Sequence, residues 1–253
     1  SVSPATMRRY LAALVADNKL VSSGANKGTR YNISPVYSIL SPIDVEAYFQ
    51  KEIDERNIVG HYNFELLGLL ADAPLFTKEE TDKLSGLQCQ FRENVSKLSP
   101  AQYQKEMERL AVDLSWKSSQ IEGNTYSLLE TERLLMEKET ASGKSLEEAQ
   151  MLLNHKEALD YLIGNPRYLQ PLSVAKIENI HGILIQDLGV DRNIRSRRVG
   201  ITGTNYRPLD NEFQIRAVLD GVCDLVNRRE AIFENALLLF VLISYIQPFT
   251  DAN

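Results

Sequence analysis

The residues best suited to chemistry stand at the end of the sequence, in Ile246 to Asn253 (IQPFTDAN). A helix breaker, a carboxylate and an amide fall within six residues there, and these are Pro248, Asp251 and Asn253. The eleven residues Ala236 to Ile246 are almost wholly apolar. They predict a buried helix that is too short to span a bilayer. A buried helix that runs into such a polar loop indicates a functional site.

A second carboxylate, Glu122, has an electrostatic reason to need a partner. It lies in Ser118 to Asn124 (SSQIEGN), at the end of a predicted helix, and Gly123 directly after it suits a C-terminal cap. A carboxylate in that place opposes the helix dipole, which costs a few tenths to ~1 kcal/mol unless a cation meets it. We therefore expect either an arginine partner from elsewhere in the chain or a solvated glutamate.

A cluster of arginines occupies Asp191 to Pro208 (DRNIRSRRVGITGTNYRP). Guanidinium groups bind phosphate in a bidentate fork, so the cluster suits anions. The same groups equally suit salt bridges in a chain with 34 acidic residues. The five arginines are Arg192, Arg195, Arg197, Arg198 and Arg207. We expect only one or two of them to be functional.

Most of the elements that must position these residues have helical periodicity. Capping signals predict helix starts at Ser3, Ser99, Ser127, Ser145 and Ser173. Strand signals are few. They predict a hairpin made of residues 19–24 and 29–34 and a second β-prone run at residues 198–209.

Composition limits the class of protein. With 253 residues, 43% hydrophobic and 25% charged, the chain is typical of a soluble globular protein. Its net charge of −6 argues against wholesale nucleic-acid binding. The two cysteines lie far apart, and reduced thiols are typical of a cytosolic protein. We expect a cytoplasmic protein with no membrane association, and homo-oligomers are left open.

His61, His155 and His181 lack ligand-like spacing and are predicted to be structural or surface residues.

The first 34 residues are an exception in charge, with five bases against one acid, or +4. The change of composition near Ser34 predicts a domain boundary there, so we divide the chain into residues 1–34 and 35–253. A basic helix followed by two strands resembles the second half of a winged helix-turn-helix. Its candidate DNA contacts are Thr6, Arg8, Arg9, Lys27 and Arg30. A basic unit used for packing or protein contact is the alternative.

Taken in order, three motifs resemble those of the Fic family. That family's signature is His-Pro-Phe-x-Asp/Glu-Gly-Asn-Gly-Arg-x-x-Arg after a buried helix, and residues 246–253 match it at Pro248, Phe249, Asp251 and Asn253. Upstream, residues 195–199 match its R-x-x-x-V segment, and residues 118–123 match the S/T-x-x-x-E-G/N helix of members that inhibit themselves. The resemblance covers roughly residues 40–253.

The resemblance implies a mainly α fold: a Fic-type helical bundle with a β-hairpin flap, preceded by the partial winged-helix segment. An N-terminal helical region would hold the inhibitory motif at residues 118–124. The core would begin at about residue 145, and the motif at residues 246–253 would be incomplete. Most members of the family transfer AMP from ATP to a hydroxyl of a target protein. The partner implied is therefore a protein substrate with a Ser, Thr or Tyr hydroxyl, and the cofactors are ATP and Mg²⁺.

The resemblance also implies roles for single residues. Asp251 would bind Mg²⁺, and the backbone N–H groups of Ala252 and Asn253 would cradle phosphate. Phe249 would be a buried anchor of the loop. Glu122 would pair with the second arginine of the motif, which would lie past Asn253, and so block the γ-phosphate. The target-docking flap would consist of Val199, Gly200, Ile201 and Thr202.

Departures from the family pattern limit these roles. Gln247 stands where the family has the histidine that removes the hydroxyl proton, and losing a general base typically costs ~10²–10⁴-fold. A glutamine can still orient a hydroxyl, so slow transfer is expected at best. Ala252 replaces the first glycine of the motif, as in the Doc branch, which acts as a kinase. The chain also resembles a protein cut within the motif, and a piece ending at Asn253 is expected to be inactive.

Three hypotheses therefore remain at this point. The first is a Fic-type AMP transferase that is inhibited through Glu122 and weakened by Gln247. The second is a non-catalytic regulator that senses nucleotide and binds DNA through the winged helix. The third, suggested only by residues 251–253, is a Doc-like protein kinase.

Overall fold

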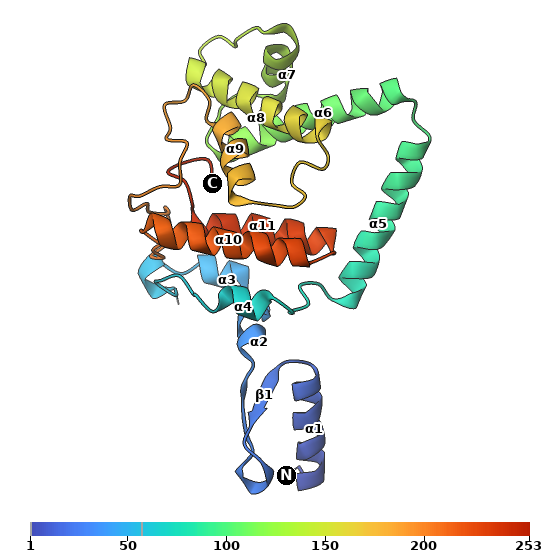
Figure 1. The fold of residues 1–253 in the computed structure, drawn as a ribbon, viewed down its shortest axis with the longest axis vertical. Coiled ribbons are helices and arrows are strands. Elements are labelled where there is room, and N and C mark those ends of the chain that lie inside the picture. The colour runs from blue at the N-terminus through green and yellow to red at the C-terminus, as the bar shows by residue number, and fades with distance from the viewer. Residues whose placement is uncertain (1, 57) are drawn as a thin grey trace.

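The chain folds mainly into helices, as predicted (Figure 1). The structure is a computed structural model that describes residues 2–56 and 58–253. Within these ranges no helix combines the length and the apolar composition needed to cross a membrane. The helices are α1 (Pro4–Ala16), α2 (Pro35–Leu40), α3 (Val45–Phe49), α4 (Leu66–Leu70), α5 (Lys78–Ser96), α6 (Pro100–Ile121), α7 (Leu128–Glu137), α8 (Leu146–Gly164), α9 (Val174–Leu184), α10 (Glu212–Arg228) and α11 (Ile232–Ile246), and the strands are β1 (Leu20–Ser23) and β2 (Arg30–Ile33). Short 3₁₀ turns lie at Asn26–Gly28 and Ile53–Glu55.

The helix starts predicted from capping signals are confirmed. Ser99, Ser127 and Ser145 each accept a hydrogen bond from the backbone N–H three residues later. In all three, the N-cap backbone N–H donates in return to the side-chain oxygen of the Glu or Gln at that third position, so two otherwise unpaired donors are satisfied. Helix α9 also begins directly after Ser173, although the Ser173 side chain makes no capping bond.

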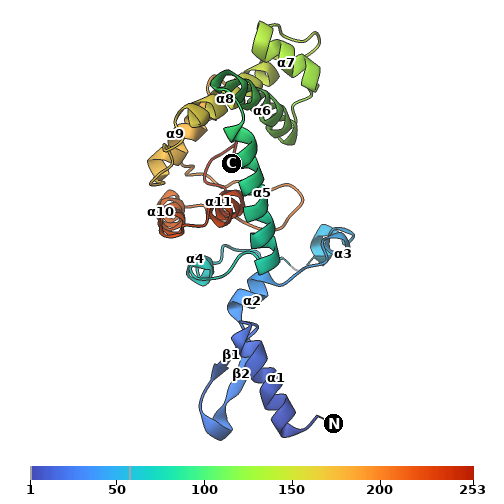
Figure 2. The same ribbon diagram turned by 90° about the vertical axis from the view of Figure 1, so that its right-hand side faces the viewer.

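The N-terminal residues form a small lobe of one helix and one hairpin. Ser3 caps α1 and Pro4 occupies its first position. Strands β1 and β2 pair antiparallel, with Leu20 opposite Ile33, so the hairpin predicted there is confirmed. Figures 1 and 2 show this lobe standing away from the remaining helices, with α2 at the connection. Neither α1 nor the two strands contain a buried residue.

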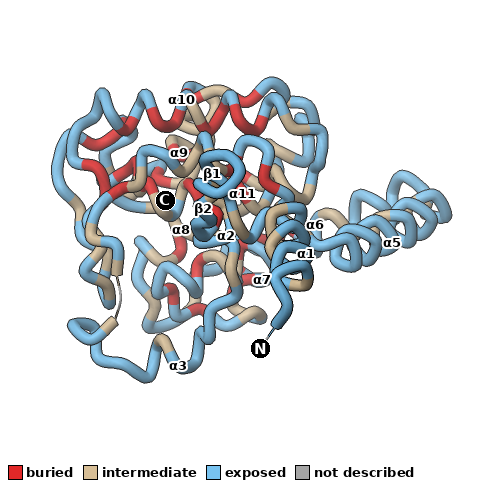
Figure 3. The backbone as a smooth tube through the Cα atoms, turned by 90° about the horizontal axis from the view of Figure 1, so that it is seen from below, coloured by how far each residue is buried: buried red, intermediate tan, exposed pale blue. Residues whose placement is uncertain are grey.

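The larger of two hydrophobic cores lies among α4, α9, α10 and α11. Leu238, Leu242 and Ile246 of α11 are buried at a spacing of four residues, which places them on one face of the helix. The buried helix predicted here is therefore confirmed for one face only, because Phe240 is 76% exposed. α11 packs against α10. Figure 3 shows the buried segments of α10 in red and α5 with none.

A second, smaller core joins α7 and α8 to the loop after α6. It contains Tyr126, Leu134, Ala149 and Leu152. α6 packs along α8, and α8 packs in turn against α9, so the two cores are connected through this layer (Figure 2). The end of α6, which carries the SSQIEGN stretch, is thereby fixed next to α8.

The second β-prone run, residues 198–209, is a loop, and the hairpin flap expected there is corrected. Its turn contains Gly203 with φ +82°, and Pro208 has no N–H to donate to a ladder. The Arg207 N–H donates to Gly60 O at 3.1 Å, and the accompanying isolated bridge joins Arg207 to His61. The backbone of this loop thus bonds to a distant segment instead of folding back on itself.

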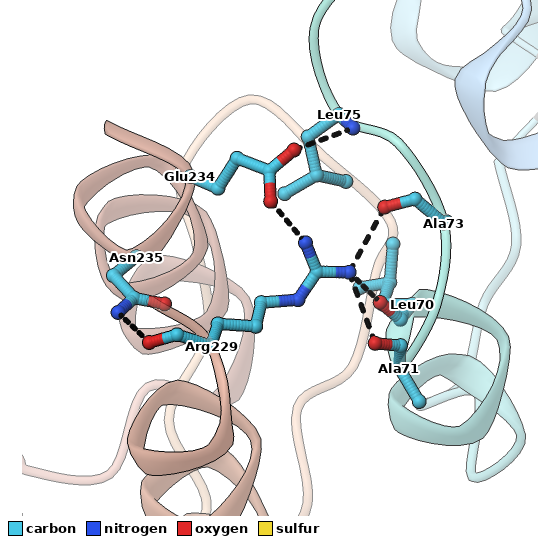
Figure 4. Close-up of polar contacts among 7 residues, drawn as sticks. All are labelled: Leu70, Ala71, Ala73, Leu75, Arg229, Glu234 and Asn235. Atoms are coloured by element: carbon cyan, nitrogen blue, oxygen red, sulfur yellow. Dashed lines mark hydrogen bonds and ion pairs between the residues drawn. The ribbon is translucent and has the colours of Figure 1, made fainter. Parts of the chain in front are cut away.

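A partly buried arginine fixes the start of α11 (Figure 4). Arg229 precedes the helix and pairs with Glu234 in its first turn. The same guanidinium donates to carbonyls after α4, at Ala71 O (3.1 Å) and Ala73 O (2.9 Å), while Glu234 accepts from the Leu75 N–H. This cluster joins the turn between α10 and α11 to the end of α4.

Candidate functional site

The candidate site is the loop that follows α11. Gln247 ends the helix in the left-handed conformation, with φ +50°, and its N–H donates to Ile243 O. Its side-chain Nε2 donates to Ser244 O at 2.9 Å, which leaves the amide oxygen as an acceptor. Figure 1 shows the loop turning back between α9 and α11, where the C-terminus lies. Gln247 is therefore held at the point where the chain leaves the helix.

One amide side chain closes this loop. Asn253 Oδ1 accepts from the Phe249 N–H at 2.7 Å, and Asn253 Nδ2 donates to Phe249 O at 3.1 Å. Phe249 is buried, as predicted for the anchor, so both of its backbone groups need these partners. Ala252 has φ +51°, in the left-handed region that favours glycine. That conformation explains why the family pattern has glycine at this position.

A buried histidine supports the loop from α9. The His181 ring stacks on Phe249 with centroids 3.7 Å apart, and its Nε2 lies 3.1 Å from Asp251 O. Its Nδ1 lies 3.3 Å from Arg192 O. Burial lowers the pKa of His181, and the two carbonyls oppose that shift. The sequence predicted a structural histidine, but nothing in its spacing indicated that it supports the site.

Arg195 fixes the loop from the other side. Its buried guanidinium donates to Gln247 O at 2.6 Å and to Ile246 O at 3.3 Å, and its backbone N–H donates to Pro248 O. A cation at the carbonyl end of α11 suits the helix dipole. Arg195 thus holds the protein's own carbonyls, and it was not identifiable from the sequence as a residue that caps a helix.

The other arginines of the cluster have mixed surroundings. Arg198 pairs with Asp210 at 2.6 Å and is 86% exposed, and Arg192 donates to Asn179. Arg197 and Arg207 are exposed. The expectation that most of these guanidinium groups serve structure fits the contacts of Arg192, Arg195 and Arg198.

Asp251 lies close enough to Glu122 for its charge to act on that carboxyl. Asp251 is exposed, and its Oδ1 accepts from the N–H of Ala252 at 2.8 Å, so that N–H is already engaged within the loop. The pKa of Glu122 is raised, first by partial desolvation and then by the negative charge of Asp251, while His155 acts in the opposite direction. The negative charge of Asp251 thus acts on Glu122, and no basic side chain among the described residues forms a salt bridge with Glu122.

The end of α6 holds Glu122 in this place. Glu122 is the C-cap of α6, and Gly123 follows with φ +90°, so the predicted cap is confirmed. Asn124 is buried, and its Nδ2 donates to Glu148 O at 2.8 Å. The Glu122 N–H donates to Ser118 O. Among the described residues no arginine or lysine pairs with Glu122, so the structure provides no counter-ion for it here.

The remaining predicted site residues lie on two other parts of the chain. Val199 to Thr202 form the first half of the loop 198–209, and Val199 lines a cavity of about 310 Å³ with His61, Arg207 and Asp210. The candidate DNA contacts all lie on the N-terminal lobe. Arg8 and Arg9 are exposed on α1, Lys27 and Arg30 are on the hairpin, and the Thr6 hydroxyl bonds to Ser3.

The helical fold and the closed loop after α11 define a Fic-type domain. Residues 171–253, which contain α9, α10, α11 and this loop, match the model of the Fic/DOC family, and they belong to that family. No curated protein matches the chain.

Two solved structures share the fold. One is a Fic domain containing signaling protein from Bacteroides thetaiotaomicron VPI-5482, with 23% identity, a TM-score of 0.56 and coverage of 63% of this chain and 63% of that chain. The other is a Fic family protein from Desulfovibrio desulfuricans G20, with 14% identity, a TM-score of 0.55 and coverage of 70% of this chain and 54% of that chain. The match thus spans less than two thirds of either neighbour's length.

Proposed function

We propose that this protein transfers AMP from ATP to a Ser, Thr or Tyr hydroxyl of a protein substrate at the loop Gln247 to Asn253. The observation that supports the proposal is that this loop is ordered by the chain itself. Asn253 closes it, and His181 and Arg195 hold it from two sides. Nucleotidyl transfer depends mainly on positioning and charge stabilisation, so a loop prepared in this way suits the reaction.

In the proposed reaction the substrate oxygen forms a bond to the α-phosphorus of ATP, and the bond from that phosphorus to pyrophosphate breaks. The hydroxyl proton leaves during this step and passes to solvent water. An uncharged amide cannot take it, so we expect the reaction to be slower by ~10²–10⁴-fold than with a general base at position 247. The free amide oxygen of Gln247 can still accept a hydrogen bond and orient the hydroxyl.

Asp251 fits the magnesium ion that such chemistry uses. Mg²⁺ usually binds one or two carboxylates together with the phosphates of its substrate. The Asp251 carboxylate is exposed and keeps one oxygen outside the contact with Ala252. Bound there, the ion would neutralise phosphate charge while His181 and Asn253 keep the loop in place.

Glu122 is the proposed restraint on activity. Its negative charge lies near that of Asp251, so the two together repel the negatively charged triphosphate of ATP. Removing that charge is therefore expected to strengthen nucleotide binding and to speed transfer.

A labelling experiment on the full-length protein tests this function. The wild type, Glu122→Gly and Gln247→His would be incubated with ATP carrying label at the α- or at the γ-phosphate. Label from the α position on protein, increased in both variants, supports AMP transfer. Label from the γ position alone would indicate a Doc-like kinase. No label from either position, even in the variant that carries both substitutions, would overturn the enzyme proposal. Glu147→Gly, on the exposed face of α8, is the matched control.

DNA-dependent regulation is the second candidate, favoured by the exposed bases on the N-terminal lobe. Arg8, Arg9 and Lys27 project from a helix and a hairpin that contain no buried residue. A gel-shift assay with DNA upstream of the protein's own gene tests it. Binding that weakens in Arg8→Glu, but not in the control Arg109→Glu on α6, would support this role. No shift at low salt would exclude it.

A further inference from the structure

Residues 49–56 and 58–63 run beside the loop 198–209 and are together called the strap here. At one end, the Arg207 N–H donates to Gly60 O at 3.1 Å. In the middle, Asn205 Nδ2 donates to Asp54 Oδ1 at 3.2 Å. At the turn of the loop, an Arg56 guanidinium nitrogen donates to Gly203 O at 3.1 Å. Three positions of the loop, 203, 205 and 207, are thus held by one distant stretch of chain.

Arg56 is the residue on which the strap depends. Its guanidinium donates to Lys51 O at 2.9 Å and to Phe49 O at 3.5 Å, and it lies 5.2 Å from the centre of the Phe49 ring and 5.6 Å from that of Tyr48. Within the described residues no carboxylate forms an ion pair with it. One guanidinium therefore joins α3, the strap and the turn of the loop through carbonyls and aromatic faces.

Stacked tyrosines connect this assembly to the end of α11. Tyr206 of the loop stacks on Tyr245 with centroids 4.7 Å apart, and its hydroxyl donates to Tyr245 O at 3.0 Å. Tyr245 stacks in turn on Tyr62 of the strap at 5.1 Å and accepts from the Asn63 N–H. Because Tyr245 precedes Gln247 by two residues, the strap fixes the loop relative to the reacting end of the helix.

We propose that Arg56 is a positioning residue for recognition of the protein substrate. By holding Gly203 it keeps the loop 198–209 in one conformation next to Gln247, so that a substrate segment binds a preordered surface. This inference rests on the proposed function. It concerns only the binding of the protein substrate, because Arg56 contacts none of the residues of the nucleotide loop.

Hydrogen exchange tests the positioning without any need for activity. In Arg56→Ala, amides of residues 199–207 are expected to exchange about tenfold faster than in the wild type, because a hydrogen bond to a charged group is lost. Arg56→Lys should recover part of the protection, and amides of α9 and α11 should not change. Arg92→Ala, on exposed α5, is the matched control. Unchanged exchange at 199–207 in Arg56→Ala would overturn the proposal.

Steady-state kinetics then tests the consequence, with the acceptor protein identified by α-phosphate labelling as the probe. Arg56→Ala is expected to raise KM for that protein about fivefold to tenfold, with kcat and KM for ATP unchanged. Asn205→Ala should act in the same direction with a smaller effect. An equal loss for both substrates would show a merely structural role and overturn the inference. If the wild type transfers no AMP, the proposed function fails, while the exchange measurement still decides whether the strap orders the loop.

Discussion

Each end of α11 is fixed by an arginine that donates to backbone carbonyls, but only one of the two arginines is paired with a carboxylate. At its start, partly buried Arg229 donates to the carbonyls that follow α4 and pairs with Glu234 (Figure 4). At its end, buried Arg195 donates to the carbonyls of Ile246 and Gln247, and no carboxylate among the described residues pairs with it. The structural end is thus internally neutralised, whereas the end that carries the candidate site keeps its positive charge.

This difference indicates what each end must do. A partly buried ion pair whose arginine also satisfies backbone carbonyls attaches one element to another, and no ligand is needed there. At the other end, Asp210 is the carboxylate whose charge acts on Arg195, and the negative charge of Asp251 acts on Glu122. A cation from outside the described contacts, such as Mg²⁺ with its nucleotide, would relieve that charge.

The largest effect is expected at the start of the helix. Arg229→Leu removes the partner of Glu234 and leaves several carbonyls without a donor, which should lower the free energy of unfolding by about 3–5 kcal/mol. Urea denaturation measures it. The neighbouring Arg228, which is exposed and pairs only with Asp224 in its own helix, is the control, and Arg228→Leu should cost less than about 0.5 kcal/mol. Similar losses in the two variants would contradict the role assigned to Arg229.

The end of the helix should respond less in stability and more in binding. Arg195→Met keeps the apolar stem but removes the donor from the carbonyls of Ile246 and Gln247, and from that of Arg197 as well, at a cost of about 2–3 kcal/mol. Because the first two of these carbonyls begin the loop, ATP affinity should fall as well, whereas Arg229→Leu should leave the affinity of the folded protein unchanged. Thermal shift with and without ATP separates the two. Arg197→Met, at an exposed neighbour, is the matched control.

His181 tests how much the loop depends on α9. His181→Phe keeps the stack on Phe249 but loses the contact to Asp251 O, and we expect about 1 kcal/mol less stability at neutral pH. A histidine with a lowered pKa in the fold contributes fully above its unfolded pKa of about 6.5, and the contribution is lost as the pH falls through the folded pKa. The wild type should therefore lose more stability than His181→Phe between about pH 7 and about pH 5, as measured by urea denaturation. Equal slopes would contradict burial as the cause.

The parts of this structure that follow from neighbours in sequence were predictable. Ser99, Ser127 and Ser145 begin helices because each carries its own partner three residues later. The loop at residues 246–253 was identified through its resemblance to a family motif. Gly123 was expected as a C-terminal cap because it is a glycine directly after Glu122, the last residue of the predicted helix.

Contacts between distant residues were not predictable from the sequence. His181 and Asp251 are 70 positions apart, and their contact follows from the packing of α9 against the loop. The exposed side of α11 has the same composition as its buried side, so periodicity could not distinguish them. The flap hairpin failed because the Arg207 N–H bonds to Gly60, which no local pattern in residues 198–209 indicates.

The smallest predicted effect concerns the carboxylate of Glu122, which lies near Asp251 in the loop after α11. Glu122→Gln removes a carboxylate that opposes the α6 dipole and lies near Asp251, so it should raise the free energy of unfolding by about 0.3–1 kcal/mol at neutral pH. The matched control is Glu147→Gln in the first turn of α8, where a carboxylate favours the dipole, and this change should lower stability by a similar amount. A carboxyl whose folded pKa is raised costs stability only while it is ionised, so the gain from Glu122→Gln should shrink as the pH falls toward that pKa. Urea denaturation of both variants at several pH values checks the signs. A loss of stability in Glu122→Gln would mean that a cation already pairs with Glu122, and the end of α11 would then be neutralised like its start.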